Sequence, residues 1–206
     1  MARLSRDFYN RPTLEAARLL LGKYLVRRWN GETLAGRVVE TEAYIGRCDK
    51  ACHAYQYRRT ARTETLFSPP GTAYIYLIYG MYHCLNFVTE PEGEPAAVLL
   101  RALQPVAGGE TMARLRYGDR PLTPSRRKNL LNGPGKVCQA LALTRAENGL
   151  DLTGDGLFLC DGPEDAGLPP FPAPEGEIVI TGPRIGVDYA EEARDFPWRF
   201  RLVQED

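Results

Sequence analysis

The sequence contains little of what metal centres and disulfide frameworks need. Its 206 residues include two histidines and five cysteines, and an odd, scattered set of cysteines is typical of reduced thiols. Cys48-x-x-x-Cys52-His53 resembles part of a zinc site, but a structural zinc site needs four ligands, and the other histidine, His83, has only Cys84 beside it. We therefore expect no metal and no cofactor, and we interpret the thiols as incidental or pocket-lining.

Long apolar runs are missing as well. No run approaches the ~18 apolar residues of a membrane span, and the first residues, Met1 to Arg6, contain no apolar stretch of the kind found in signal peptides. These absences argue against an integral membrane protein and against a secreted one. We expect a cytoplasmic protein with no membrane association.

The chain also lacks net charge, because 26 basic side chains balance 26 acidic ones. Taken as a total, this balance argues against a nucleic-acid partner. Residues 1–150, however, carry 22 basic and 13 acidic side chains, whereas residues 151–206 carry 4 and 13, so the two regions have net charges of +9 and −9. Charge asymmetry of this kind indicates a polyanion-binding face, and we expect the acidic C-terminal region to lie largely away from it.

Hydrophobic patterning predicts an α+β fold with a largely antiparallel sheet. Two strands joined by Asn30-Gly31 form the strongest hairpin signal, because this dipeptide favours a tight primed turn. A composition of 44% hydrophobic and 25% charged residues is sufficient for one buried core, so we expect a single domain. The predicted strands cover 24–29, 33–44, two segments of 73–88 around Gly80, 97–103, 178–181 and 198–203; the predicted helices cover 13–21, 109–117 and 134–143; and 161–176 is a predicted loop.

Two carboxylates and a phenol share one face of a predicted strand. In the segment from Val38 to Tyr44, alternation of side chains places Val38, Glu40, Glu42 and Tyr44 on the same side. One interpretation is the solvated face of an antiparallel sheet. The other is a pocket in which a partly desolvated carboxylate accepts a proton from water.

An aromatic hairpin favours the second interpretation. Tyr74 and Tyr76 share a strand face, where tyrosines commonly pack half-buried. The predicted tip of this hairpin, Tyr79-Gly80-Met81-Tyr82, is different, because bulky apolar side chains at an exposed turn bring no folding benefit. Minor-groove proteins insert side chains of this kind between base steps.

Basic residues flank these aromatic segments. Residues 53–63 combine Arg58, Arg59 and Arg62 with aromatics and hydroxyls, a composition that provides phosphate contacts and stacking surfaces together. A second basic stretch covers 114–128, and Gly133-Pro134-Gly135-Lys136 opens a predicted helix whose free amides can hold a phosphate, although it is not a Walker sequence. Each group alone fits a solvated surface, but their occurrence with the aromatic hairpin favours a nucleic-acid partner.

Several motifs in order resemble the alkyladenine DNA glycosylase family, also called the 3-methyladenine or methylpurine glycosylases. The resemblance covers nearly the whole chain, from about Leu4 to Val203. It implies one DNA glycosylase domain over residues 1–206, with a curved sheet, surrounding helices and a protruding β-hairpin. The motifs are Arg37 to Tyr44, His53, Pro70 to Tyr82, Asn86, Leu99 to Leu103, Gly133 to Lys136 and Arg184 to Val187.

The resemblance implies a monofunctional enzyme of base-excision repair. Such an enzyme flips alkylated or deaminated purines (3-methyladenine, hypoxanthine, ethenoadenine and 7-methylguanine) out of double-stranded DNA and hydrolyses the N-glycosidic bond with an activated water. The chain has four lysines and none lies in the Glu42 or Tyr76 motifs, which favours water over a lysine nucleophile. We expect a bacterial monomer that associates with the nucleoid through DNA and has no regulatory N-terminal extension.

Residue roles carried over from the family fall into three groups. For catalysis, Glu42 resembles the general base, while Arg101 and the backbone carbonyl of Ile185 resemble the groups that hold the water. For binding of the base, Tyr44 resembles the residue that stacks on one face, and His53 and Tyr76 resemble those that stack on the other. His53 would also form a hydrogen bond with the edge of the base. Asn86 resembles the residue that crowds the exocyclic amine of guanine. The residues expected to contact DNA are Tyr79 as the wedge, Met81, Tyr82, Arg58, Thr60, Arg62 and Lys136.

Two other functions are compatible with parts of this pattern. A lesion sensor would flip bases without cleaving them, but it has no need of Glu42 and Arg101. An RNA-binding module would use the tyrosines for stacking and would bind single-stranded RNA more strongly than duplex DNA.

Overall fold

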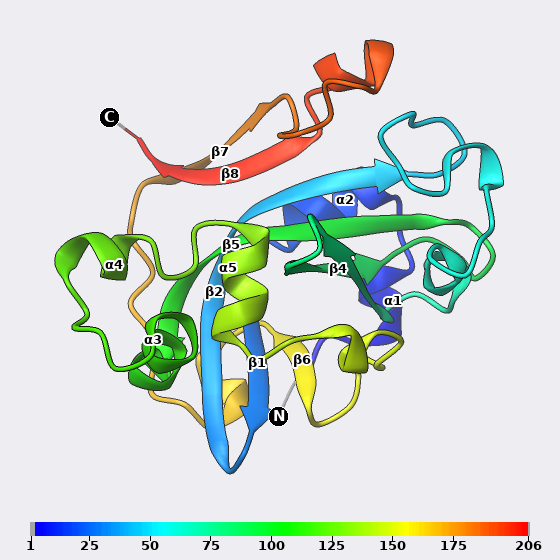
Figure 1. The fold of residues 1–206 in the computed structure, drawn as a ribbon. Helices are drawn as coiled ribbons and strands as arrows, with labels where there is room; N and C mark the ends of the chain where they lie inside the picture. Colours follow the sequence, from blue (N-terminus) through cyan, green and yellow to red (C-terminus); the bar gives the residue numbers. More distant parts are fainter. Residues whose placement is uncertain (1–2, 206) are drawn as a thin grey trace.

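The computed structural model describes residues 3–205 and has an α+β fold built on an eight-stranded sheet (Figure 1). The helices are α1 (Arg6–Tyr9), α2 (Thr13–Leu19), α3 (Gly109–Tyr117), α4 (Pro124–Lys128) and α5 (Pro134–Ala140). The strands are β1 (Tyr24–Trp29), β2 (Glu32–Ile45), β3 (Ala73–Ile78), β4 (Tyr82–Val88), β5 (Ala96–Ala107), β6 (Leu157–Cys160), β7 (Glu177–Gly182) and β8 (Arg199–Gln204). Single 3₁₀ turns lie at Tyr55–Tyr57, Glu64–Phe67, Arg145–Glu147, Pro163–Ala166 and Glu191–Asp195.

Strand β2 is the centre of the sheet. The order is β3-β4-β5-β2-β1-β6, and all the pairings between the described strands are antiparallel. One edge of β2 pairs with β5; its other edge pairs first with β1 and then, from Glu40 to Glu42, with β8, which also pairs with β7. Figure 1 shows β7 and β8, orange to red, beside the second half of β2. The predicted α+β class with a largely antiparallel sheet is therefore confirmed.

The turn between β1 and β2 has the predicted form. Trp29 pairs with Glu32, so the loop contains only two residues, Asn30 and Gly31, whose φ angles are 48° and 78°. A primed hairpin turn requires positive φ at both central positions, which Asn and Gly tolerate better than other residues. This local chemistry fixes the start of the 14-residue strand that carries Glu42.

The prediction that Val38 lies on the same face of β2 as Glu40, Glu42 and Tyr44 is wrong. Val38 belongs to the main core, and so does Ala43, five positions along the same strand. A regular strand would place residues an odd number apart on opposite faces, but the pairing of β2 with β5 is irregular just after Val38. The irregularity changes the phase, so Val38 faces the core while Glu40, Glu42 and Tyr44 face the other side.

Two apolar clusters lie on the two sides of this part of the sheet. The main core includes residues of α2, α3, α5 and most strands, and α2 is tied to β2 by the Thr41 hydroxyl, which donates to the Ala17 carbonyl at 2.8 Å. A smaller cluster includes Leu66, Phe67 and Tyr74, with Tyr44 and Tyr76 packed against it. This second cluster supports the aromatic residues of the candidate site.

Three elements lie outside the sequence-based predictions. The strand β6 has only four residues, all buried, and a run this short carries no usable periodicity. The helices α1 and α4 have four and five residues, below the length at which helical propensity is informative, so tertiary contacts must stabilise them. Residues 161–176 are a loop, as predicted, apart from the 3₁₀ turn at Pro163–Ala166. Across residues 3–205, no helix combines the length and apolar character of a membrane span.

Candidate active site

Glu42 is a completely buried carboxylate with three hydrogen-bond donors. Its Oε2 accepts the Tyr44 hydroxyl at 2.8 Å and lies 3.3 Å from Nη1 of Arg101, while its Oε1 accepts the backbone N–H of Ile185 at 2.8 Å. Burial raises the pKa of Glu42 above its ordinary value, and the three donors oppose this rise. The result is a carboxylate that is more basic than one in water yet held in one orientation.

Arg101 connects this carboxylate with a second one. Its Nε donates to Oε1 of Glu40 at 3.0 Å, and Arg199 on β8 approaches the same oxygen at 3.5 Å. The two glutamates therefore alternate with two arginines, and the charges balance within the cluster. The solvated-face interpretation of this strand is wrong, because Glu42 is fully buried and Glu40 keeps only 20% of its side chain exposed.

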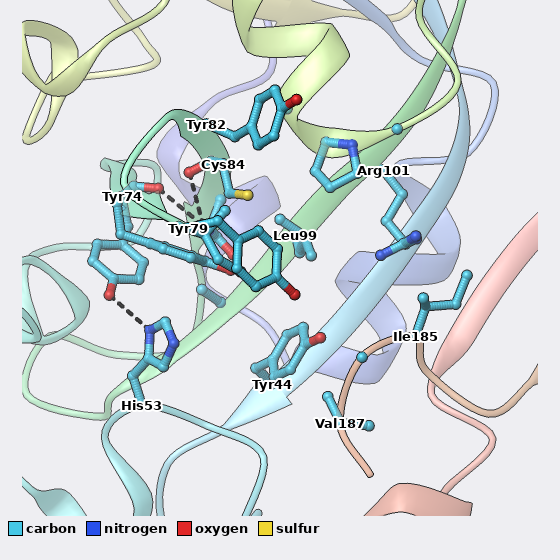
Figure 2. Close-up of a pocket in the computed structure, with 18 of the residues that line it drawn as sticks. Tyr44, His53, Tyr74, Tyr79, Tyr82, Cys84, Leu99, Arg101, Ile185 and Val187 are labelled. Carbon is cyan, nitrogen blue, oxygen red and sulfur yellow. Dashed lines mark hydrogen bonds between the residues drawn. The ribbon is translucent and has the colours of Figure 1, made fainter. Parts of the chain in front are cut away.

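Beside Glu42 lies a pocket of about 820 Å³, a size typical of small-molecule and cofactor sites. Figure 2 shows Arg101 and Ile185 on one side of it, His53 and Tyr74 on the other, and Tyr44 between them. Aromatic and apolar side chains form most of its walls. Its lining includes Tyr44, His53, Tyr74, Tyr76, Cys84, Asn86, Leu99, Arg101, Ile185 and, toward the hairpin and α5, Tyr79, Tyr82 and Lys136.

His53 and Tyr76 come together, but their rings are not parallel. The two centroids are 4.6 Å apart and the planes make an angle of 80°. A flat base can therefore stack on only one of them, with the other ring presenting its edge. Burial and the nearby Arg62 lower the pKa of His53 to about 4, so its imidazole is neutral at physiological pH, and its Nδ1 lies 3.0 Å from the Tyr74 hydroxyl.

Asn86 lines the pocket with its amide already oriented. Its Nδ2 donates to the backbone carbonyls of Tyr74 at 3.1 Å and Cys84 at 3.3 Å. Both amide hydrogens are committed to the backbone, which leaves Oδ1 as the polar atom available to a ligand. The side chain thus offers a fixed hydrogen-bond acceptor.

The tip of the β3–β4 hairpin exposes the predicted bulky side chains. Tyr79 is 79% exposed and Met81 is 66% exposed. Tyr79 and the following Gly80 have φ angles of 53° and 67°, so a bulky tyrosine occupies the left-handed region that favours glycine. Strain of this kind without burial is characteristic of functional positions.

Of the other residues predicted to contact DNA, three lie on the exposed loop after His53, and Lys136 lines the pocket. Arg58, Thr60 and Arg62 are exposed, and Arg62 reaches inward, 3.4 Å from Nε2 of His53 and 5.4 Å from the centre of the Tyr76 ring. These three residues and Met81 are not part of the pocket wall, whereas Lys136 is, and it donates to Oδ1 of Asn132 at 2.7 Å.

Thr63, which the sequence analysis did not single out, organises the basic loop. Its hydroxyl donates to the Arg58 carbonyl at 2.9 Å and accepts the Thr60 N–H at 2.8 Å. The sequence signal for such a turn is a hydroxyl residue in a polar segment, since threonine hydroxyls commonly bond nearby backbone groups; in the structure Thr63 is buried. Asp49 was missed as well; it forms a buried ion pair with Arg184.

The cysteines lie apart from any cluster of metal ligands. Cys52 and Cys84 line the pocket, and burial raises the pKa of Cys52 to about 12, so this thiol stays protonated. Across the described residues, no three His, Cys, Asp or Glu side chains come together as a group that could hold a metal ion.

A fully buried carboxylate beside an aromatic pocket, with an exposed tyrosine hairpin at its mouth, is the arrangement expected of an enzyme that acts on an extruded base. The model of the Methylpurine-DNA glycosylase (MPG) family matches residues 7–206. The chain belongs to this family, and is a DNA repair glycosylase whose substrate is damaged DNA.

Relatives of this chain are similar over almost their whole length. Proteins named "Putative 3-methyladenine DNA glycosylase" from Alkaliphilus oremlandii and Clostridium perfringens are 52% and 50% identical to it, over 97% of this chain and 95% of each relative. One of the same name from Bacillus cytotoxicus is 52% identical over 94% of this chain and 92% of the relative.

Proposed function

We propose that this protein removes 3-methyladenine and related damaged purines from duplex DNA in base-excision repair. We infer that its substrate bases also include hypoxanthine, ethenoadenine and 7-methylguanine. The observation that carries the proposal is the position of Glu42, a fully buried carboxylate held by Tyr44, Arg101 and Ile185 directly behind an aromatic pocket. We also propose that it acts as a monomer on nucleoid DNA in the cytoplasm; the relatives named above are bacterial.

In the proposed complex, the hairpin tip enters the duplex where the damaged nucleotide leaves it. Tyr79 fills the gap in the base stack, while Met81 and Tyr82 contact the neighbouring groove. Arg58, Thr60, Arg62 and Lys136 bind the phosphates on either side. The exposure of the tip supports this assignment, because its apolar surface is available to the DNA.

The extruded base then occupies the pocket between Tyr44 and the opposite aromatic pair. Because His53 and Tyr76 are nearly perpendicular, one of them stacks and the other contacts the base edge. Nδ1 of His53 is held by the Tyr74 hydroxyl, so the edge contact would use Nε2 in place of its 3.4 Å contact with Arg62. Asn86 places its bulk where guanine would carry its exocyclic amine, and this steric crowding disfavours the normal base.

Hydrolysis follows from the raised basicity of Glu42. The carboxylate takes a proton from a water molecule, the water oxygen bonds to C1′ of the sugar, and the bond from C1′ to the base breaks with its electron pair leaving on the base. A base that is cationic through alkylation departs as a neutral molecule, whereas a neutral lesion must also be protonated. Arg101 orients the water together with the Ile185 carbonyl, which accepts no backbone hydrogen bond from residues 3–205.

Glu42→Gln tests this assignment. The amide keeps the shape of the side chain but cannot accept the proton, so we expect base release to fall by at least about 10²-fold, the lower range for general acid–base catalysis. Affinity for a lesion-containing duplex should be retained. The measurement is single-turnover base release from duplexes containing 3-methyladenine or hypoxanthine, with Glu177→Gln on β7 as a control that leaves the pocket intact. Release at the wild-type rate would show that another group is the base.

Borohydride trapping on the same duplexes distinguishes hydrolysis from lyase chemistry. Lys136 is the one lysine among the pocket-lining residues, and burial together with Arg116 lowers its pKa. A monofunctional enzyme leaves an intact abasic site and forms no covalent adduct with DNA in the presence of borohydride. Trapping of an adduct that Lys136→Ala abolishes would instead indicate a Schiff-base intermediate.

A further inference from the structure

Asp49 and Arg184 form an ion pair whose side chains are both completely buried. Nη1 of Arg184 lies 2.5 Å from Oδ2 of Asp49, and Nη2 lies 2.7 Å from Oδ1. The same two nitrogens donate to the backbone carbonyls of Ala43 at 2.8 Å and Ala193 at 3.0 Å. One guanidinium therefore connects the end of β2, the segment after it and the C-terminal part of the chain.

The flat faces of this guanidinium are also occupied. Its carbon lies 4.6 Å from the centre of the Tyr44 ring and 5.1 Å from the centre of the Trp198 ring. Tyr44 lines the pocket, so Arg184 supports the ring of a residue proposed to stack on the base. A lysine cannot reproduce this arrangement, because its ammonium is neither planar nor a two-pronged donor.

Arg184 holds two of the segments that surround Glu42. The residue after Arg184 is Ile185, whose N–H donates to Oε1 of Glu42, and the carbonyl held by Arg184 belongs to Ala43, the residue between Glu42 and Tyr44. Two of the three donors to Glu42, the Ile185 amide and the Tyr44 hydroxyl, are thus carried by segments that Arg184 fixes.

We propose that Arg184, held by Asp49, is a positioning residue that keeps Glu42 and Tyr44 in their working geometry. The inference rests on the proposed function of Glu42. Stability alone is a poor reason for such a pair, because a buried ion pair contributes little relative to apolar residues of similar volume. Its hydrogen bonds instead hold the segments that surround Glu42, the proposed general base, and that carry Tyr44 in the pocket wall.

The positioning role has a consequence for pH dependence. Glu42 faces Arg101 from β5, Tyr44 and Glu40 from its own strand, and the Ile185 amide from the segment after β7, while Arg199 on β8 pairs with Glu40. The Ile185 and Tyr44 hydrogen bonds lower the pKa of Glu42. If Arg184 no longer fixes their donors, the pKa of Glu42 rises, and the acidic limb of the activity profile moves to higher pH.

The test measures single-turnover base release against pH for Arg184→Lys and Asp49→Asn, with rates expressed per folded molecule. We expect the rates of both to fall by ~10²-fold, as small displacements of catalytic groups do. The acidic limb of Arg184→Lys, which keeps the positive charge, should move to higher pH; Asp49→Asn also removes a negative charge, so its readout is the rate alone. Trp198→Leu, which leaves the ion pair in place, should show a smaller change in the same direction and covers the case in which the first two variants do not fold.

Arg27→Lys is the matched control. Arg27 pairs with Glu147 at 2.8 Å, keeps only 12% of its side chain exposed, and does not contact the pocket. Its replacement should lower stability without changing the pH profile. Wild-type rate and profile in the Arg184, Asp49 and Trp198 variants, beside an inactive Glu42→Gln, would overturn the positioning role alone. Release at the wild-type rate by Glu42→Gln would overturn the role of Glu42 and this inference with it, whereas no base release by the wild-type protein would overturn the proposed function.

Discussion

Glu40→Gln gives the sharpest test of the electrostatics around Glu42. The substitution removes one negative charge but keeps an oxygen that can accept the Nε–H of Arg101, which lies 3.0 Å from Oε1 of Glu40. The charge of Glu40 raises the pKa of Glu42. Its removal therefore lowers that pKa, and the pH below which activity is lost should fall.

The magnitude follows from the spacing of alternate residues on a strand, roughly 6 to 7 Å. Two like charges at this distance in an effective dielectric of about 20 interact by about 2.5 kcal/mol. Arg199 pairs with Glu40 and offsets part of this repulsion, so we expect the acidic limb of the activity profile to move to lower pH by about one pH unit. At neutral pH the weaker base should also slow base release several-fold.

The assay is single-turnover base release between about pH 4 and pH 8. Glu177→Gln serves as the control, because Glu177 also belongs to a buried ion pair, with Arg37 at 2.6 Å, but does not contact Glu42. An unchanged acidic limb in Glu40→Gln, or one displaced to higher pH, would refute the electrostatic reasoning. The sign is opposite to that expected for Arg184→Lys, so the two variants cannot be explained by a general loss of structure.

Two further predictions concern the DNA. Tyr79→Ala should leave the unfolding temperature nearly unchanged, because the side chain is 79% exposed, yet weaken binding to a lesion duplex about tenfold or more relative to undamaged duplex, measured by fluorescence anisotropy; equal loss on both would remove the wedge role. A plot of the logarithm of affinity against the logarithm of salt concentration should have a slope of roughly −3 if Arg58, Arg62 and Lys136 each contact a phosphate. Arg58→Ala should reduce the magnitude of this slope by about one. An affinity that does not depend on salt would contradict the phosphate contacts.

Local chemistry explains why much of the fold is predictable from sequence. Asn30-Gly31 defines a primed turn without help from distant residues, and the predicted helix over 109–117 coincides with α3, which is closed by Gly118 with φ of 63°. The change of phase after Val38, by contrast, is not set by local sequence. It depends on how two strands pair, and a pattern of alternating residues in one strand carries no information about irregularities in its partner.

The candidate site divides in the same way. The two carboxylates and the aromatic hairpin are recognisable as unusual from short segments, although the individual roles of these residues come from family resemblance. The ion pair between Asp49 and Arg184 joins residues 135 positions apart, and nothing local marks either one as a partner. The perpendicular rings of His53 and Tyr76 likewise follow only from packing.

The pairing of β8 with β2 has a consequence for the order of events during synthesis. The N-terminal part of β2, with its Asn-Gly turn and β1, can form early, but the Glu42 region also needs Arg101, Ile185 and the strand Arg199–Gln204. Contacts between such distant segments form late, because the intervening chain must first be closed into a loop. A nascent chain therefore contains Glu42 long before this carboxylate can act as a general base. Glycosylase activity should appear only when β8 has joined the sheet.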